Sequence, residues 1–422
     1  MKTRQPPHGT GAYRTPGLYF DWRAGEVEVP PAASSGVPLF VGLTGGGNVR
    51  AEGPALYRFT RWQQFEQAFA ADGVSALLAC AVRGFFENGG RLCYLKPADA
   101  DAPATPDGQK LADAIAAPFE PRGMLDDLED IDLVCVPDIM RPEIAQSSAR
   151  VFDLQARVVE YCARMGERFA ILDAYAGNPA NVTEHGADAM LIDSIGQWQT
   201  LPPNYGAIYF PWIRVVDHRA SSRTSSGLLV PPCGHVAGVY ARSDRRDGVH
   251  KPPANEVLEG ALDLGYVIGD SEQALLNDAG VNCLRESRGW GIRVWGARTL
   301  SDRPAWRYVN VTRVMLALTR WLEYNMRDLV FEPNGVPLWT LTAERLKRYC
   351  SELFRRGALK GDSEADAYFV KCDAETNAQF SRDSGIVVAE VGLAPAAPSE
   401  FVIVRITQSA SGVNITVPTA WQ

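Results

Sequence analysis

Short apolar segments alternate with amphipathic ones between about residues 36 and 215. Segments such as VPLFVGL, IDLVCVPD and RFAILDA are continuous and apolar, which is typical of strands buried on both faces. Between them, RWQQFEQAFA and the longer segment Pro142–Met165 place apolar residues three and four positions apart, which predicts helices. Further strands are expected at 91–97 and 205–213, and further helices at 76–88, 107–119 and 187–198. The alternation predicts an α/β domain with a mostly parallel, helix-covered sheet over residues 36–225.

A polar loop rich in Ser and Arg, His218–Gly227, predicts a domain boundary. Beyond it, paired prolines and glycine-punctuated segments between Val230 and Asn310 indicate short strands. Helices are expected from about Pro304 to Asp328 and from about Thr340 to Arg356, followed by strand-like segments AYFVKCD, SGIVVAEVGLAP and EFVIVRITQ. Residues 226–408 are therefore predicted to form a second domain of the α+β class.

Both ends of the chain have the character of extended arms, at residues 1–35 and 409–422. The first arm contains one strand-like segment, GLYFDW, which is too short to form a hairpin by itself. It needs a partner sheet, either in the same chain or in a neighbouring one.

Composition places the chain among ordinary soluble proteins, with 422 residues, 46% hydrophobic and 22% charged. No apolar run reaches the roughly 18 to 20 residues of a membrane helix, and the N-terminus has no apolar signal region. These features predict folding in the cytoplasm, with any export by a route other than Sec. The eight cysteines are scattered without metal-site spacing, which predicts small buried side chains in a reducing compartment.

Charge is unevenly distributed along this acidic chain, whose net charge is −8. The balance argues against nonspecific nucleic-acid binding. Residues 98–138 hold 11 acids and 2 bases, whereas residues 301–360 hold 11 bases and 6 acids. One acidic and one basic region predict two faces with different neighbours.

The basic region contains two candidate docking surfaces. Arg313, Arg320 and Arg327 are spaced seven apart on a predicted helix and so share one face. Such a stripe is either a solvated face or a surface for an acidic partner. The second candidate is a cluster on the next helix, comprising Arg345, Lys347, Arg348, Arg355 and Arg356.

Candidate enzyme chemistry is weak. GLTGGGNV (Gly42–Val49) follows a strand but lacks the register of a nucleotide-binding loop, so a turn requiring positive φ explains it better. Asp173 ends a strand and His185, His218 and His235 are available, yet no nucleophile turn of the G-x-S-x-G kind exists. The histidines show no i, i+4 pairing for a metal. We therefore expect no catalytic residues, no metal site and no cofactor.

Five segments resemble, in the same order, the core of contractile tail sheath proteins, which occur in contractile-tailed phages and related bacterial injection devices. They are PPCGHVAGVYARSDRRDGVHKPPANE (Pro231–Glu256), GVNCLR (Gly280–Arg285), VWGARTL (Val294–Leu300), WRYVNVTR (Trp306–Arg313) and FEPN (Phe331–Asn334). The resemblance implies an outer α/β domain, similar to subtilisin in fold, inserted into an inner α+β domain. It also implies that both arms add strands to the sheets of neighbouring subunits. The residues implied in these arms are Gly17, Leu18, Tyr19, Phe20, Trp22, Phe401, Val402, Ile403, Val404 and Ile406.

The function implied by the resemblance is structural. The subunit would polymerise into stacked hexameric helical rings around a tail tube and contract to drive the tube through a target envelope. Its partners would be other copies of itself, the tube protein, and baseplate and terminator proteins, without nucleic acid or membrane insertion. It would assemble in the cytoplasm and become part of a virion tail or an injection particle. The resemblance also implies a basic helix facing the tube, formed either by Arg313, Arg320 and Arg327 or by the cluster that includes Lys347 and Arg348. The alternatives are a minor sheath paralogue near the baseplate or terminator, and a soluble α/β hydrolase.

Overall fold

The computed structural model describes residues 35–44, 55–69, 73–98, 107–178, 187–203, 205–218, 227–329, 331–383, 386–398, 405–409 and 412–416. Several features of the sequence lie outside these residues. They are the N-terminal arm with Gly17, Leu18, Tyr19, Phe20 and Trp22, most of the GLTGGGNV loop, His185, and Phe401, Val402, Ile403 and Val404.

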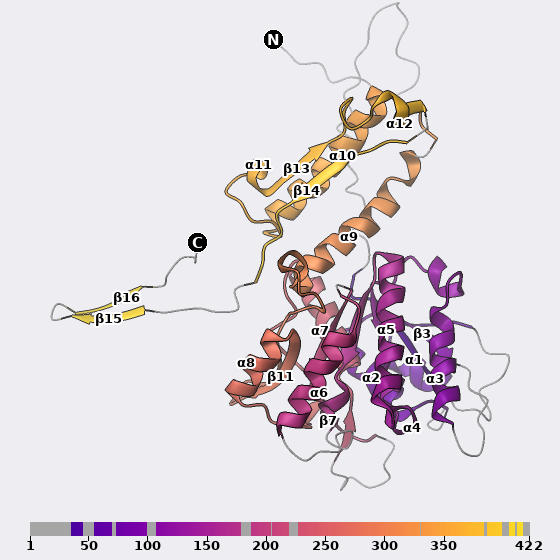
Figure 1. The fold of residues 1–422 in the computed structure, drawn as a ribbon, viewed down its shortest axis with the longest axis vertical. Helices are drawn as coiled ribbons and strands as arrows, with labels where there is room; N and C mark the ends of the chain where they lie inside the picture. The colour runs from indigo at the N-terminus through magenta and orange to yellow at the C-terminus, as the bar shows by residue number, and fades with distance from the viewer. Residues whose placement is uncertain are drawn as a thin grey trace, which may run out of the picture. The chain divides into compact units, whose positions relative to one another are not determined.

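A sheet of nine strands forms the centre of the α/β region, in the order β2-β3-β1-β4-β5-β6-β11-β12-β9 (Figure 1). Its members are β1 (Pro38–Leu43), β2 (Tyr57–Phe59), β3 (Cys93–Ala98), β4 (Leu133–Cys135), β5 (Phe169–Asp173), β6 (Gly206–Phe210), β9 (Glu256–Val257), β11 (Val281–Ser287) and β12 (Gly291–Trp295). The central strands from β3 to β11 run parallel, while β2, β12 and β9 pair antiparallel with their neighbours. The expected α/β class with a mostly parallel sheet is confirmed, because five buried strands occur where the apolar segments predict them.

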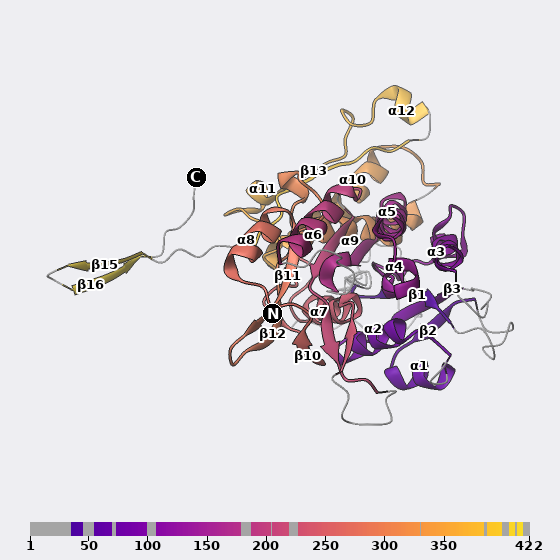
Figure 2. The same cartoon turned by 60° about the horizontal axis from the view of Figure 1, so that its bottom comes forward.

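Helices cover both faces of this sheet, and alternate residues of each strand enter different cores. In β1, Leu39 and Val41 pack with one cluster of buried side chains, and Phe40 packs with the other. Figure 2 shows β1 and β3 lying between α3 and α5 on one side and α1 and α2 on the other. The covering helices are α1 (Trp62–Ala68), α2 (Ala76–Glu87), α3 (Gly108–Ala116), α5 (Ser148–Met165), α6 (Ala187–Thr200), α7 (Cys233–Arg246) and α8 (Asp270–Asp278).

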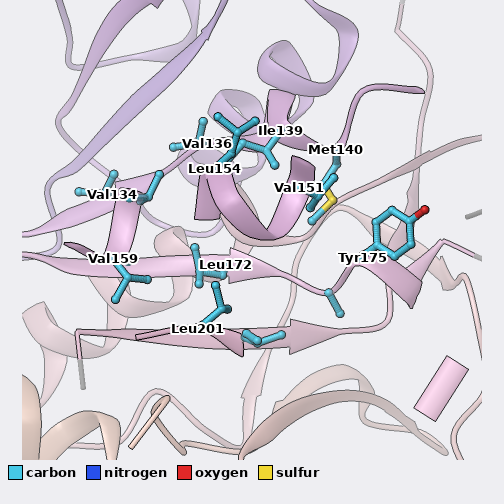
Figure 3. Packing of buried hydrophobic residues seen from close by; sticks show 14 of the residues in the cluster. Val134, Val136, Ile139, Met140, Val151, Leu154, Val159, Leu172, Tyr175 and Leu201 are labelled. Atoms are coloured by element: carbon cyan, nitrogen blue, oxygen red, sulfur yellow. The ribbon is translucent and has the colours of Figure 1, made fainter. Parts of the chain in front are cut away.

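The first core lies between the sheet and α5. Val151, Leu154 and Val159 of this helix belong to one buried cluster with Val134 and Leu172 of the strands (Figure 3). The segment Pro142–Met165 was expected to be one helix but is two. A short α4 (Pro142–Ala145) ends before Ser147, whose hydroxyl accepts a hydrogen bond from the backbone N–H of Arg150 and starts α5. An N-cap serine of this kind satisfies an otherwise unpaired helix N–H.

Helix α7 corrects the expectation of short strands after Val230. Residues Cys233–Arg246 are helical, and the first nine of them are buried. The glycines that suggested strand punctuation instead allow close packing on α2. A Cβ at Gly234 would overlap with the backbone of Ala81, and one at Gly238 would lie 2.5 Å from the Phe85 carbonyl oxygen. Glycine lowers helix propensity, so glycines in a sequence argue against a helix. That inference fails here because packing against α2 requires two glycines on one face of α7.

The expected boundary at residues 225–226 also differs from the structure. Strands β9, β11 and β12 follow that boundary yet belong to the same sheet as β1, so the sheet continues to about Trp295. A smaller antiparallel sheet, β10-β7-β8, lies beside it and also spans the expected boundary. Its strands are β7 (Ile213–Val215), β8 (Leu228–Val230) and β10 (Ala261–Leu264). The α/β region therefore includes residues that the sequence pattern assigned to the second domain.

The C-terminal region begins with two long helices, α9 (Val309–Asn325) and α10 (Val336–Arg355). A two-stranded antiparallel sheet follows, formed by β13 (Tyr368–Lys371) and β14 (Glu390–Leu393). Short helices α11 (Glu364–Ala367) and α12 (Gln379–Asp383) flank β13 in sequence. A core of Leu318, Trp321 and Leu346 joins the two helices to this sheet.

The last described element is a hairpin of β15 (Arg405–Ser409) and β16 (Gly412–Thr416). Ile406 pairs with Ile415 within the same chain. The sequence pattern separated these residues into the end of a domain and an extended arm, whereas they pair with each other.

Candidate functional site

Helix α9 connects two separate cores. Its first turns are buried with the α/β region, where Val309 and Leu316 join the core on the α2 and α7 side of the sheet. Its later turns place Leu318 and Trp321 in the small core of the C-terminal region. Trp321 stacks on Tyr349 of α10, with ring centroids 4.5 Å apart. One helix therefore packs in the cores of both regions.

Arg313 lies at the centre of a buried charge network at the start of α9. Its side chain is 3% exposed and forms two hydrogen bonds to Asp244, of 2.8 and 2.6 Å. A third bond, of 2.9 Å, reaches Asp132, and the guanidinium lies 4.8 Å above the ring of Tyr240. Asp132 also accepts the backbone N–H groups of Gly36 and Val37 just before β1. The network thus fixes α9, α7 and the starts of β1 and β4 to one another.

Arg320, two turns further along α9, is buried as well. Its Nη1 donates to the Glu167 carbonyl oxygen at 2.7 Å, and its Nη2 lies 3.7 Å from Asp132. Asn310 adds a further tie, because its amide donates to the carbonyl oxygens of His250 and Ala396. These bonds connect α9 with segments on both sides of it in the sequence.

Burial and charge pairing shift the pKa values in this network. Burial opposes the charged form of Arg313, but attraction to Asp244 and Asp132 outweighs it and raises the pKa of Arg313 above its usual value. Burial raises the pKa of Asp244, and Arg313 counteracts part of that rise. Burial, together with the nearby Glu323, raises the pKa of Glu167 to about 7. The raised pKa of Arg313 therefore supports a charged guanidinium that Asp132 and Asp244 share.

The predicted stripe of three exposed arginines is therefore corrected. Arg313 and Arg320 face the interior, where their charges are neutralised by Asp132 and Asp244. Only Arg327 is exposed, and it forms an ion pair of 2.7 Å with Glu129. The seven-residue spacing correctly places Arg313 and Arg320 on one face of α9, which acids from distant segments turn into a buried face. Arg327 lies beyond the end of α9 at Asn325.

The second basic cluster remains at the surface on α10. Lys347 and Arg348 are exposed, and neither forms an ion pair with any residue that the structure describes. The other members are paired: Arg345 with Asp328 at 2.6 Å, and Arg355 and Arg356 with Glu352. Lys347 and Arg348 are thus the available cationic pair of this helix.

The residues considered for catalysis do not come together. Asp173 is buried and accepts the backbone N–H of Cys233 at 2.8 Å, and burial raises its pKa to about 7. His235 is buried against Gly84 with its Nδ1 unpaired, and burial lowers its pKa to about 4. His218 is exposed. Over the described ranges, no group of three His, Cys, Asp or Glu side chains is placed to hold a metal ion.

The cysteines and helices add two further findings. All eight cysteines are free thiols, and all except the half-buried Cys80 are buried. None of the described helices combines the length and the apolar character that crossing a membrane requires.

Comparisons with known proteins place these features in a family context. Two adjoining family models match the chain: the phage tail sheath protein central domain over residues 123–300 and the phage tail sheath C-terminal domain over residues 301–409. Their junction falls after β12 and before α9, where the large sheet ends.

Individual relatives are more distant in sequence. The tail sheath protein of Salmonella phage ViI is 22% identical over 264 residues, covering 59% of this chain and 40% of that protein. The tail sheath protein of Burkholderia phage BcepMu is 28% identical over 165 residues, covering 36% and 33% respectively. The chain therefore spans less than half the length of these relatives.

Solved structures match over nearly the whole chain. The sheath complex of the PVC extracellular contractile injection system, in its contracted state, has a TM-score of 0.70 at 27% identity, covering 95% of this chain and 99% of that one. The helical sheath of the anti-feeding prophage, also contracted, has a TM-score of 0.69 at 28% identity and coverage of 94% and 100%. A chain in the baseplate of the anti-feeding prophage has a TM-score of 0.70 at 28% identity, with coverage of 94% and 99%.

Proposed function

The chain belongs to the phage tail sheath family, and we propose on that premise that it is a subunit of a contractile sheath around a tail tube. Sheath proteins are structural, so no catalytic step is involved. In this proposal, copies polymerise into stacked hexameric helical rings, and contraction drives the tube through a target envelope. Assembly takes place in the cytoplasm, and the product is a virion tail or an injection particle. The likeness to contracted sheaths over almost the entire chain carries the proposal.

The incomplete sheet of the C-terminal region supports strand exchange between subunits. Strands β13 and β14 pair only with each other among the described residues. A two-stranded sheet is marginal by itself and gains from further strands at its edges. We infer that the N-terminal arm (Gly17–Phe20 and Trp22) and the residues Phe401–Val404 supply such strands to neighbouring copies. Backbone hydrogen bonds would then link subunits while leaving their domains free to rotate.

The two regions joined by α9 correspond, in this proposal, to an outer and an inner domain. The outer domain would be the subtilisin-like α/β region, extending to about residue 300. The inner domain would comprise the C-terminal region completed by the arms. Because α9 contributes to both cores, it would couple the two domains while each moves as a rigid body during contraction.

The exposed pair Lys347 and Arg348 on α10 is the best candidate for contact with the tube. It lacks acidic partners among the described residues, so its charge is available to an acidic tube surface. Arg327 is a weaker candidate because Glu129 already neutralises it. Exposed pairs of this kind contribute only ~0–1 kcal/mol each, so a tube contact repeated over many copies would hold the sheath without locking any single ring.

A second candidate function is a minor sheath paralogue beside the baseplate. It is favoured by the equal TM-score of a chain in the anti-feeding prophage baseplate. Baseplate and terminator proteins are proposed partners in either case.

Electron microscopy of the protein co-expressed with its neighbouring tail genes would distinguish the candidates. Long striated tubes with many rings are expected for a main sheath subunit. A single ring at the baseplate would indicate the paralogue. Monodisperse particles without any assembly would contradict both functions.

A further inference from the structure

Strands β11 and β12 form a hairpin in the α/β region (Figure 2). This hairpin carries two exposed tryptophans. Trp290 in the turn is 69% exposed, and Trp295 at the end of β12 is 42% exposed. Between them, Ile292 and Val294 are buried in the core of the region. Exposed tryptophan contributes little to an isolated fold, whereas tryptophan and arginine dominate the energetics of protein interfaces. The hairpin therefore has the composition of a docking surface.

Arginines surround these tryptophans. Arg285 and Arg293 lie directly opposite each other in the hairpin, an arrangement of like charges that destabilises a strand pair. Asp270 neutralises Arg285 at 2.8 Å. Arg293 has no acidic partner among the described residues; it lies 5.2 Å above the ring of Trp290 and donates to the Asn255 carbonyl oxygen. Arg288, exposed in the turn, forms no bond with any described side chain. Glu286, also exposed in the hairpin, offsets part of this charge, so a small positive excess from Arg288 and Arg293 remains.

The same chain carries a surface of opposite character between η1 (Ala117–Phe119) and β4. It contains five acids and one arginine around Met124, which is 48% exposed. The acids are Glu120, Asp126, Asp127, Glu129 and Asp130. Arginines of the same chain pair with three of them, Glu120 with Arg157, Asp126 with Arg164 and Glu129 with Arg327, so Asp127 and Asp130 carry the charge that is left for a partner. Arg164 and Arg168 hold this segment in place by donating to the carbonyl oxygens of Phe119 and Leu125, at 2.9 and 2.8 Å. Asp127 is exposed and has no ion-pair partner in the described part of the chain.

Topology keeps the two surfaces apart within one molecule. The acidic segment precedes β4, so it lies at the edge of the sheet where the parallel strands begin. Strand β11 runs parallel to β6, β5 and β4. The turn Arg288–Trp290 follows β11, so this turn lies on the side of the sheet where the parallel strands end. Strands β5 and β6 also separate β4 from β11. The surfaces can meet only between two copies.

We propose that the hairpin surface of one copy (Arg288, Trp290, Arg293 and Trp295) docks on residues 120–130 of a second copy, with Met124 against the tryptophans. This contact rests on the proposed function, because a sheath supplies the second copy. It joins two different surfaces head to tail, so it does not close on itself and adds subunits to an open array. Charge complementarity would fix how the two surfaces align. The tryptophans, which the contact would bury, would contribute most of the affinity.

A photocrosslinking residue such as p-benzoylphenylalanine at position 290 tests the contact directly. In assemblies formed by the full chain with its tail proteins, the expected product is a covalent dimer whose linked peptide contains residues 120–130. A dimer linked through any other peptide would overturn the assignment, as would assemblies without a crosslinked dimer.

Charge reversal separates this contact from the proposed function. Arg288→Glu is expected to lower the yield of sedimenting tubes about tenfold or more, because it places like charges opposite each other. Adding Asp127→Arg in the same chain should restore most of that loss. Arg91→Glu is the matched control, since Arg91 is exposed and has no ion pair among the described residues; it should leave the yield unchanged.

The outcomes are distinguishable. Normal tubes from Arg288→Glu, or failure of Asp127→Arg to restore them, would overturn the contact but leave the sheath function intact. Wild-type protein that never forms tubes or rings would contradict the proposed function and this contact together.

Discussion

The nine-stranded sheet and the two-stranded β13–β14 sheet differ in how many of their covering helices, core residues and strand partners come from the same chain. The large sheet has helices on both faces, two extensive cores and an internal arginine whose charge is matched by two aspartates. The small sheet packs over a core of three buried side chains, and its strands have no further partners among the described residues. The chain itself therefore covers both faces of the large sheet, whereas the small sheet is suited to accept strands from outside.

In the proposed sheath, this difference would give the two regions different roles. The α/β region, with its paired internal charges, would rotate as a rigid body. The marginal sheet, completed by neighbouring chains, would connect subunits throughout that movement. Helix α9 packs with both cores, so its buried network would couple them.

Removing the donor strands should have the largest effect. Deleting residues 1–24 is expected to abolish polymerisation while leaving a folded monomer, because the α/β region does not need the arm. Sedimentation and circular dichroism of the purified variant measure the two properties. Filaments formed by the truncated protein would contradict strand exchange.

Breaking the internal charge network should have the next largest effect. Arg313→Met leaves Asp132 and Asp244 buried without their cation, which typically costs about 3–5 kcal/mol of unfolding free energy. Chemical denaturation of the monomer measures this loss. The matched variant Arg348→Met changes an exposed cation and should alter stability by no more than about 0.5 kcal/mol. Similar stability of the two variants would show that the network does not hold α9.

Disturbing the contact between α2 and α7 should have a moderate effect. Gly234→Ala adds a methyl group against the backbone of Ala81, and overpacking of this kind costs roughly 1–3 kcal/mol. Gly196→Ala in α6 is the control, because an added Cβ there meets no atom within 4 Å. That change should stabilise the protein by about 0.5–1 kcal/mol through helix propensity. Equal thermal midpoints for both variants would count against tight packing of α7.

The smallest expected effect is a pH dependence from Glu167. Its pKa of about 7 in the folded chain lies above that of an ordinary glutamate, so the folded state retains a proton that the unfolded state releases. Stability from this group is present at pH 4 and is lost as the pH rises through 7. Glu167→Gln should therefore flatten the decline in unfolding free energy between about pH 4.5 and 7.

The control for this experiment is Glu352, whose pKa is lowered by its hydrogen bond with Arg356. Its contribution persists throughout that pH range, so Glu352→Gln should leave the slope unchanged. An identical slope in wild type and Glu167→Gln would refute the role of Glu167.

The sequence predicted the parts of this fold that follow from local patterns. Buried strands such as β4 and β5 and amphipathic helices such as α5 occur where their periodicity places them. Helix α7 was missed because its glycines serve packing against a distant helix. The domain boundary was placed too early because nothing in the local pattern shows that β11 joins β6.

In the candidate site, too, the sequence predicts local features but not contacts between distant segments. Lys347 and Arg348 could be identified as an exposed pair from the sequence, since their helix is amphipathic. The burial of Arg313 depends on Asp132 and Asp244, which lie 181 and 69 residues away. The excess of acids in residues 98–138 was the only available signal, and it did not reveal which acid would turn inward.

Hydrogen–deuterium exchange of the free chain and of assembled particles tests the central comparison most directly. Amides of β13 and β14 are expected to exchange rapidly in the free chain and to become strongly protected on assembly. Amides of β4 and β5 should be protected equally in both. Full protection of β13 and β14 in the free chain would contradict the claim that this sheet is completed by neighbouring subunits.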